Sequence, residues 1–288
     1  TWTKFSDLVP TARWTTSARI VAVEHYHPPE FPIRFRQPYR TIRNLLYCRF
    51  QARCLHACIC MSNRARETFI NARYGYPRSA LHVIYNGVDT DRFSFSESVR
   101  QEIRRKLGIT HETMVLYCGR LSEEKGPDIL LDAWSSFTDA QRSSLKLVIV
   151  GAGSMKEELQ AEFARQPFSE NVHFDDFQDD VLGHLAACDI FVMPSRAESF
   201  GISLAEAMAM GRYTIATRVG GVPELVTSPT QGALIEPESP EDLKDAILTA
   251  AQDNERREKI GSEAARHIRE NFTVDRMKTE TLNVLIGN

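Results

Sequence analysis

Short apolar runs alternate with amphipathic segments over most of the 288-residue chain. Strands that are buried on both faces of a parallel sheet read as continuous apolar runs, and the amphipathic segments between them are typical of connecting helices. The pattern therefore predicts an α/β protein with parallel sheets. Three strands are expected early in the chain, at residues 19–25, 56–62 and 81–86.

A more regular series follows residue 93. Six strands are expected at residues 113–121, 145–151, 171–177, 189–195, 212–217 and 232–237, with helices at 127–137, 155–165, 179–187 and 202–210 and two more after Pro240. This alternation predicts a doubly wound domain. Such domains bind their ligands at the carboxyl ends of the strands, so the residues that follow each apolar run are the informative ones.

The length fits two domains at about 150 residues each. The segment NGVDTDRF at residues 86–93 reads as a linker, because Asn-Gly favours a turn and the charged residues after it lack strand alternation. We predict a partial N-terminal domain at 1–92 and a C-terminal, ligand-binding domain at 93–272. The last segment, 273–288, is expected to be a helix that packs back on the first domain.

The composition excludes several classes of protein. Hydrophobic residues make up 42% and charged residues 25% of the chain, which argues against wholesale disorder. No apolar run approaches the ~18 residues of a membrane span, and the first residues lack the pattern of a secretory signal. A cytoplasmic location is therefore expected. Because the chain begins with Thr1, we expect a further segment upstream.

The charge is unevenly distributed. Residues 1–80 hold thirteen Lys and Arg but four Asp and Glu, whereas the remainder holds 22 basic and 34 acidic residues. The Arg-rich stretch 39–53 reads as an amphipathic helix with a cationic face. A basic end favours an anionic surface as partner, either nucleic acid or phospholipid headgroups, and the acidic remainder argues against a dedicated nucleic-acid binder. We therefore expect peripheral binding to the inner face of a membrane.

Four cysteines crowd together at Cys48, Cys54, Cys58 and Cys60. Their spacing does not repeat the C-x2-C pairs of zinc ribbons, and no pair of histidines supplies the other half of a finger. Reduced thiols packed in a core are favoured, and a metal site is the alternative.

Two acidic residues and a glycine follow the strand expected at 189–195. Glu198 lies in the loop, Gly201 opens the next helix, and Glu206 lies one turn into it. The free N–H groups at the start of this helix suit a phosphate group. Ionised carboxylates accept hydrogen bonds only, which suits the vicinal hydroxyls of a sugar. For Glu206 alone, an acidic residue favoured by the helix dipole would be the simpler interpretation.

Two basic residues follow the strand expected at 113–121. Arg120 ends that strand, and Lys125 precedes Gly126 and Pro127, where proline marks the start of a helix. Two fixed cations at one crevice can neutralise a diphosphate without a metal ion, since Arg offers a planar fork and Lys a point charge. Taken alone, the pair would more often be solvated surface charges.

Gly151 and Gly153 follow the strand expected at 145–151 and open a helix. A dinucleotide-binding fingerprint requires a third glycine at the position of Lys156, so NAD binding is disfavoured. Close approach of a ligand to Gly151 is still expected.

Together these residues resemble the retaining nucleotide-sugar glycosyltransferases of the GT-B fold, family 4. The resemblance rests on NGVD at 86–89, GRLSEEKG at 119–126, the Glu-x7-Glu segment from Glu198 to Glu206, and VGGVPELV at 219–226. It covers nearly everything from Arg19 onward. It implies two Rossmann-like domains, of which the N-terminal one is incomplete here, because the family usually has further strands before the position of Arg19.

The resemblance also implies roles for individual residues. Arg120 and Lys125 would hold the donor diphosphate, Glu206 the ribose hydroxyls and Glu198 the donor sugar. The backbone amides of three residues would lie against sugar and phosphate, namely Phe200, Gly201 and Ile202. His25, with His27 close behind, would end a strand of the N-terminal domain and face the anomeric carbon. The family commonly has glycine where Asp176 stands, near the loop that receives the base.

The expected function is therefore retaining transfer of a sugar from a nucleotide diphosphate sugar, UDP-linked by default, to the hydroxyl of a glycan or lipid-linked acceptor. No metal and no other cofactor is expected: Asp89 and Asp91 spell Asp-x-Asp, a metal-binding signature, but they lie in the linker. Three alternatives are open. The chain could bind a nucleotide sugar without catalysis, be one subunit of a split enzyme whose partner chain completes the N-terminal domain, or be a nucleotide-sugar epimerase.

Overall fold

The computed structural model describes residues 19–24, 50, 53–71, 76–176 and 180–287. Contacts divide the chain into two units. The first comprises Thr1–Gly87 together with Val274–Asn288, and the second comprises Val88–Thr273. Both units contain a parallel sheet, which confirms the α/β class predicted from the apolar runs.

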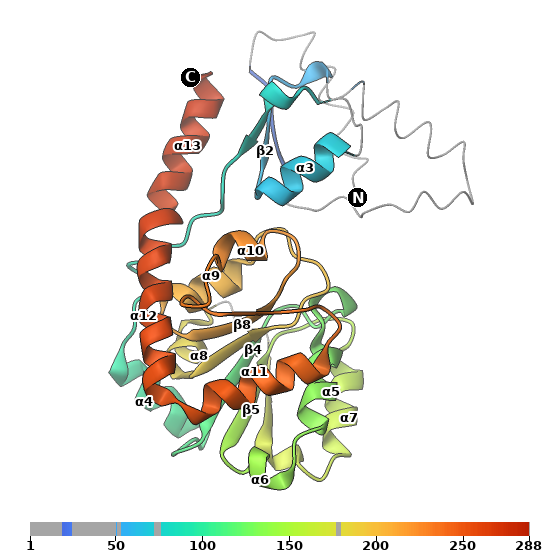
Figure 1. Cartoon of the computed structure of the whole chain (residues 1–288), viewed down its shortest axis with the longest axis vertical. Coiled ribbons are helices and arrows are strands. Elements are labelled where there is room, and N and C mark those ends of the chain that lie inside the picture. The colour runs from blue at the N-terminus through green and yellow to red at the C-terminus, as the bar shows by residue number, and fades with distance from the viewer. Residues whose placement is uncertain (1–18, 25–49, 51–52, 72–75, 177–179, 288) are drawn as a thin grey trace, which may run out of the picture. The chain divides into compact units, whose positions relative to one another are not determined.

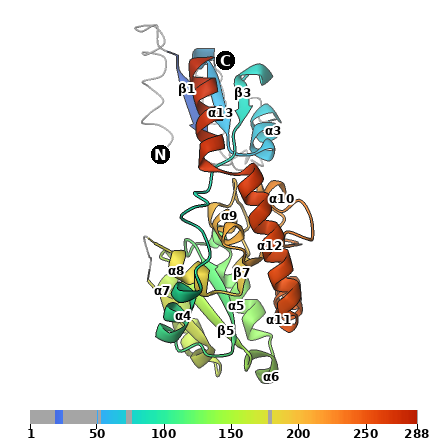
Figure 2. The same cartoon turned by 90° about the vertical axis from the view of Figure 1, so that its left-hand side faces the viewer.

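The first unit has three parallel strands in the order β1-β2-β3. Strand β2 is labelled in Figure 1, and β1 and β3 are labelled in Figure 2. They span Val21–Glu24, Ala57–Cys60 and Leu81–Val83, and helix α3 (Asn63–Asn71) packs against β2 and β3. All four residues of the central strand β2 are buried, as its uninterrupted apolar sequence predicts. Helix α13 (Val274–Ile286) belongs to this unit, and its Met277 sulfur accepts a hydrogen bond from the Gly87 backbone N–H at 3.2 Å.

The described cysteines of this unit are free thiols within its core. Cys54, Cys58 and Cys60 are all buried. A hydrogen bond to the Cys60 thiol, together with burial, raises the pKa of Cys58, so that this thiol stays protonated at neutral pH. In the described part of the chain, no three His, Cys, Asp or Glu residues form a group that could hold a metal ion. Cys48 and nearly all of the Arg-rich stretch 39–53 lie outside the described residues.

The second unit is built on six parallel strands in the order β6-β5-β4-β7-β8-β9. In chain order they are β4 (Thr113–Cys118), β5 (Leu145–Val150), β6 (Val172–Asp175), β7 (Ile190–Met193), β8 (Tyr213–Thr217) and β9 (Ala233–Ile235). The strand order turns back between β4 and β7. This switch point leaves a crevice at the carboxyl ends of the central strands, where ligands of doubly wound sheets bind.

Helices cover both faces of the larger sheet (Figures 1 and 2). On one face lie α5 (Pro127–Ser135), α7 (Lys156–Ala164) and α11 (Pro240–Gln252), and on the other α8 (Leu182–Ala187), α9 (Ile202–Ala209) and α12 (Asn254–Asn271). The remaining helices of the second unit are α4 (Glu97–Lys106), α6 (Asp139–Arg142) and α10 (Val222–Leu225). The core of the first face is anchored by Trp134, which is fully buried and lies edge-on to Phe137 at 5.2 Å.

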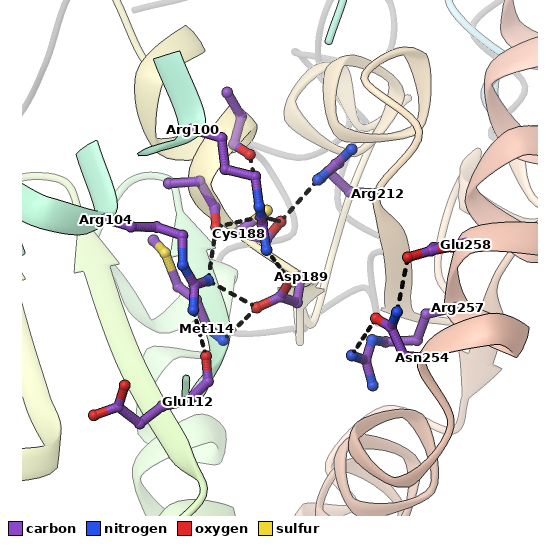
Figure 3. Close-up of polar contacts among 12 residues, drawn as sticks. Arg100, Arg104, Glu112, Met114, Cys188, Asp189, Arg212, Asn254, Arg257 and Glu258 are labelled. Atoms are coloured by element: carbon purple, nitrogen blue, oxygen red, sulfur yellow. Dashed lines mark hydrogen bonds and ion pairs between the residues drawn. The ribbon is translucent and has the colours of Figure 1, made fainter. Parts of the chain in front are cut away.

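A cluster of charged residues closes the amino end of this sheet (Figure 3). Asp189 precedes β7 and accepts hydrogen bonds from Arg100 at 2.5 Å and Arg104 at 3.0 Å, both on α4. The N–H of Met114, at the start of β4, donates to the same carboxylate at 2.8 Å. The cluster therefore ties α4 to the first residues of two central strands.

No helix in the described ranges is both long and apolar enough to cross a membrane.

Candidate functional site

A cavity of about 360 Å³ lies at the carboxyl ends of β4 and β5. It is lined by Cys118, Gly119, Arg120, Val150, Gly151, Ala152 and Val181. Gly151 allows the two chain turns to meet there, because a Cβ on it would lie 2.0 Å from the Gly119 carbonyl oxygen. Two residues predicted from the sequence, Arg120 and Gly151, thus line the same cavity.

Arg120 comes two residues after the end of β4 and its side chain is exposed. Its backbone is fixed, since its carbonyl accepts a hydrogen bond from the Tyr117 hydroxyl at 2.9 Å. Its guanidinium forms no ion pair with any residue that the structure describes. A fixed backbone with an uncommitted cation suits an anionic ligand in the cavity.

Lys125 and Glu198 form a direct ion pair. The Lys125 Nζ lies 2.7 Å from the Glu198 Oε2 and 3.4 Å from a carboxylate oxygen of Glu124. Lys125 ends a 3-10 turn (Glu123–Lys125) between β4 and α5, whereas Glu198 lies in the loop after β7. The two side chains are 21% and 15% exposed, so they are shielded but accessible.

Glycine at position 126 brings the turn and the loop together. Gly126 has a φ of 64°, a left-handed conformation that favours glycine, and precedes Pro127 at the start of α5. A Cβ on Gly126 would lie 2.1 Å from the Pro194 carbonyl oxygen. The other carboxylate oxygen of Glu198 accepts a hydrogen bond from the Ser199 N–H at 3.1 Å, which fixes its orientation.

Helix α9 begins at the same end of the sheet. Its N-cap, Gly201, has φ 97° and ψ 61° and offers no side chain to cap the first turn. Gly201 therefore leaves the N–H groups of that turn without a side-chain cap, as expected for a phosphate-binding helix start. Ile202 is 52% exposed, whereas the Phe200 ring is buried and packs on Phe272 at 5.8 Å. The ring of Phe200 thus belongs to the core, and only its backbone can serve the predicted role.

Glu206 is a partly buried carboxylate on α9. It forms no hydrogen bond through its side chain to the described residues. Burial raises the pKa of Glu206 to about 7, a shift that Arg92 opposes and Asp180 reinforces. Burial also raises the pKa of the Cys118 thiol in the cavity wall to about 12, with a smaller contribution from the charge of Glu206. A buried carboxylate without donors can accept hydrogen bonds from the hydroxyls of a ligand.

Two residues that stand where a motif has glycine contact each other. Lys156, which stands where a dinucleotide fingerprint requires glycine, forms an ion pair with Asp176. Asp176 stands where glycine is common in the family that the sequence resembles. The Lys156 ammonium lowers the pKa of the Asp176 carboxyl. The two charges at these positions therefore compensate each other.

The structure does not test the histidine prediction. His25 and His27 lie outside the described residues, and β1 ends immediately before them at Glu24. Burial raises the pKa of Glu24 to about 7. Sequence reasoning missed two residues near the site, Arg196 and Arg92. A signal existed for Arg196, which stands between the end of a strand and Glu198.

Comparisons with known proteins identify the family of this chain. The family model of glycosyl transferases group 1 matches residues 99–267, more than half of the chain, and the model of glycosyltransferase family 4 matches residues 1–92. The D-inositol 3-phosphate glycosyltransferase of Corynebacterium jeikeium is 34% identical over 204 residues, which cover 67% of this chain and 49% of the relative. A second relative, from Corynebacterium glutamicum, is 33% identical over 212 residues, which cover 69% of this chain and 54% of the relative. It is named GDP-mannose-dependent monoacylated alpha-(1-6)-phosphatidylinositol monomannoside mannosyltransferase.

Among solved structures, Anabaena HepE in complex with UDP is 26% identical, with a TM-score of 0.83 over 98% of this chain and 82% of HepE. This chain spans about half the length of the curated relatives it matches. The chain belongs to the group 1 glycosyl transferases and has an α/β architecture of the GT-B type.

Proposed function

We propose that the chain transfers a glycosyl group from a nucleotide diphosphate sugar to an acceptor hydroxyl and retains the anomeric configuration. The observation that carries this proposal is the Lys125–Glu198 pair, at 2.7 Å, at the same sheet end as the cavity lined by Arg120. The names of the relatives, which are glycosyltransferases, support it.

Each charged group has a task in this reaction. In glycosyl transfer, positive charge develops on the sugar ring while negative charge grows on the departing diphosphate. Arg120, Lys125 and the N–H groups at the start of α9 stabilise the diphosphate. Glu198 holds the donor sugar and Glu206 accepts hydrogen bonds from the ribose hydroxyls. A diphosphate draws Lys125 away from Glu198 and leaves that carboxylate for the sugar.

We favour UDP as the donor nucleotide. HepE, which is 26% identical, was solved in complex with UDP. GDP is the alternative, because one relative is named as GDP-mannose-dependent. A thermal-shift panel of UDP, GDP and ADP separates them, since a ligand at 100 times its Kd stabilises the fold by about 2.7 kcal/mol.

Transfer by this chain is proposed to need no divalent metal, because two basic side chains and a helix start are proposed to neutralise the diphosphate. We expect EDTA to leave nucleotide affinity and turnover unchanged. Turnover that requires added Mg²⁺ or Mn²⁺ would contradict this part of the proposal.

The acceptor is proposed to be lipid-linked or a glycan at the inner face of a membrane. The excess of basic residues in 1–80 favours an anionic surface. The relative named for a phosphatidylinositol mannoside supports a lipid-linked acceptor. Co-sedimentation with vesicles that contain anionic lipid, but not with neutral vesicles, is the expected result.

The decisive test is the variant Lys125→Ala, assayed by UDP binding and by sugar transfer. We expect turnover to fall by about 10²-fold or more, as when other donors to a developing negative charge are removed. Arg218→Gln is the control, since Arg218 is 52% exposed and makes one 3.3 Å contact with Glu236. Wild-type affinity and turnover in Lys125→Ala would overturn the proposal.

Product analysis separates the alternatives. Free nucleotide diphosphate released in step with glycosylated acceptor indicates transfer, whereas an isomerised nucleotide sugar indicates an epimerase. Binding without either product would favour a non-catalytic chain or one subunit of a split enzyme, an alternative that the partial coverage of the relatives keeps open.

A further inference from the structure

Arg196 has an acceptor for every one of its five side-chain N–H groups. Nε donates to Glu238 at 2.5 Å and Nη2 to the other oxygen of that carboxylate at 3.1 Å. Nη1 and Nη2 donate to the two oxygens of Asp128 at 2.8 and 2.6 Å, and Nη1 also donates to the Glu123 carbonyl at 2.7 Å. A guanidinium has five N–H donors, so none is left for a ligand.

These contacts join the two segments that carry the Lys125–Glu198 pair. Arg196 lies two residues before Glu198, and its acceptor Glu123 begins the turn that Lys125 ends. The backbone strengthens the connection, because the Arg196 N–H donates to the Glu124 carbonyl at 2.8 Å. Both the backbone and the side chain of Arg196 thus hold the Lys125 turn against the Glu198 loop.

Arg196 also contacts a third loop through Glu238, which follows β9. Its φ is 59°, and among the described residues it is the sole non-glycine residue with a positive φ. This conformation is strained for a residue with a Cβ and persists only where the surroundings hold it. The two hydrogen bonds from Arg196 to the Glu238 carboxylate supply such a restraint.

Arg196 differs from an ordinary surface ion pair. Its side chain is 24% exposed and faces two carboxylates bidentately, whereas Arg218 has a single contact with Glu236 and both side chains are more than half exposed. Exposed single contacts contribute little, but bidentate Arg–carboxylate pairs fix geometry.

We propose that Arg196 is a positioning residue that locks the Lys125 turn and the Glu198 loop at a fixed spacing, so that both side chains meet the nucleotide sugar together. This role rests on the proposed function. Arg196 itself touches no ligand and acts through Lys125 and Glu198. Misplacing such groups by about 1 Å can lower a rate by up to about 10²-fold.

The test is a double-mutant cycle between Arg196 and Lys125, read by calorimetric binding of UDP or GDP, whichever the wild-type chain binds more tightly. Arg196→Gln is expected to weaken binding by about tenfold. Arg196→Lys is expected to weaken it similarly, because an ammonium keeps the charge but loses the planar fork. UDP and GDP carry no donor sugar for Glu198 to hold, so their binding reports the Lys125 side of the pair. In the Lys125→Ala background, Arg196→Gln should therefore cause no further loss, since groups that act through one another are not additive. Arg218→Gln is the matched control and should bind like wild type.

Measurements are made below the melting temperature of each variant, so that affinity is separated from stability. A lower Tm with wild-type affinity in both Arg196 variants would overturn the role, as would losses that multiply with that of Lys125→Ala. If Arg196→Gln does not fold, Arg196→Lys and Glu238→Gln complete the cycle. Glu238→Gln weakens only the contact of Arg196 with Glu238 and leaves its contact with Asp128. Binding of neither nucleotide by the wild-type chain would overturn both this role and the proposed function, whereas the other outcomes bear on Arg196 alone.

Discussion

The two ends of the six-stranded sheet hold carboxylates in opposite states. At the amino end, Asp189 accepts hydrogen bonds from two arginines and from the Met114 N–H (Figure 3). Its side chain is 13% exposed. At the carboxyl end, Glu206 is partly buried but accepts no hydrogen bond within the described part of the chain. Asp189 thus already accepts three hydrogen bonds from described donors, whereas none of the described donors occupies Glu206.

The arginines at the amino end also donate hydrogen bonds to backbone carbonyl oxygens. Arg100 and Arg104 donate to carbonyl oxygens at the end of α8, including that of Ala187 at 2.7 and 3.3 Å. Arg212 donates to the Cys188 carbonyl at 3.1 Å. The last carbonyls of a helix lack partners within the helix and carry partial negative charge, so cations there are favourable. Polar groups with partners of this kind support the fold, whereas a carboxylate without a protein donor is able to accept hydrogen bonds from a ligand.

The largest change in the free energy of unfolding is expected for Asp189→Ala. Removing this carboxylate leaves Arg100 and Arg104 partly buried without their partner, and breaking a buried pair costs about 3–5 kcal/mol of the free energy of unfolding. Urea unfolding measures this loss, and binding of UDP by the folded fraction should stay at the wild-type level. The exposed Glu236→Gln change is the control, expected within about 0.5 kcal/mol of wild type. A loss below 1 kcal/mol for Asp189→Ala would mean that the cluster is not a structural element.

Glu206→Gln is expected to raise the free energy of unfolding, whereas Asp189→Ala lowers it. Because burial raises the pKa of Glu206 to about 7 in the folded state, ionising it disfavours folding. The penalty is absent below the pKa of the unfolded chain, near 4.5, grows as the pH rises to 7, and is complete above it. At pH 8 the variant should therefore be more stable than wild type by about 2–3 kcal/mol.

Urea unfolding at pH 4, 6 and 8 checks this expectation. The difference between Glu206→Gln and wild type should vanish at pH 4 and be largest at pH 8. A variant that is less stable than wild type at pH 8 would show that Glu206 has partners that stabilise its charge, and the contrast with Asp189 would fail.

The contrast between the two ends also separates what the sequence predicts from what it does not. The strands of the second unit and helices such as α5 and α9 were predicted to within a few residues, because continuous apolar runs and start signals such as Pro127 are local. Helix α4 was missed, although Ser96 caps it and basic residues fill its last turn. The reason is that α4 has no fully buried residue, and its short apolar stripe, Val99 and Ile103, is half-buried among charged residues.

The candidate site residues were predicted by motif, but the contact between Lys125 and Glu198 was not. Lys125 and Glu198 are 73 residues apart, and the contact between them exists only because β4 and β7 are neighbours in the sheet. The Lys156–Asp176 pair and the five contacts of Arg196 likewise depend on strand order, which a single sequence does not give. The state of Glu206 was also inaccessible, because burial, not residue type, sets its pKa.

Nucleotide affinity should depend on pH through Glu206. The ionised carboxylate accepts hydrogen bonds from ribose hydroxyls better than the protonated group, so UDP affinity should rise by up to about tenfold between pH 6 and 8. Arg92 and Asp180 are the charged groups that also act on Glu206. Glu206→Gln supplies the baseline, because the terminal phosphate of UDP itself titrates near pH 6. Equal pH profiles in wild type and variant would mean that Glu206 does not meet the nucleotide.

The smallest effect concerns backbone strain at the carboxyl end, at Glu238. Both Glu238→Ala and Glu238→Gly remove the carboxylate that Arg196 holds, so comparing them cancels that loss and leaves the backbone. With φ at 59°, alanine bears the left-handed penalty of about 1–2 kcal/mol and glycine does not. Relative to alanine, glycine lowers the free energy of unfolding by about 0.4–1 kcal/mol, because it makes the unfolded chain more flexible. Glu238→Gly should therefore unfold at higher urea than Glu238→Ala, by about 0.5–1 kcal/mol. The reverse order would show that the loop relaxes once Arg196 releases it, and that no strain is held at this end of the sheet.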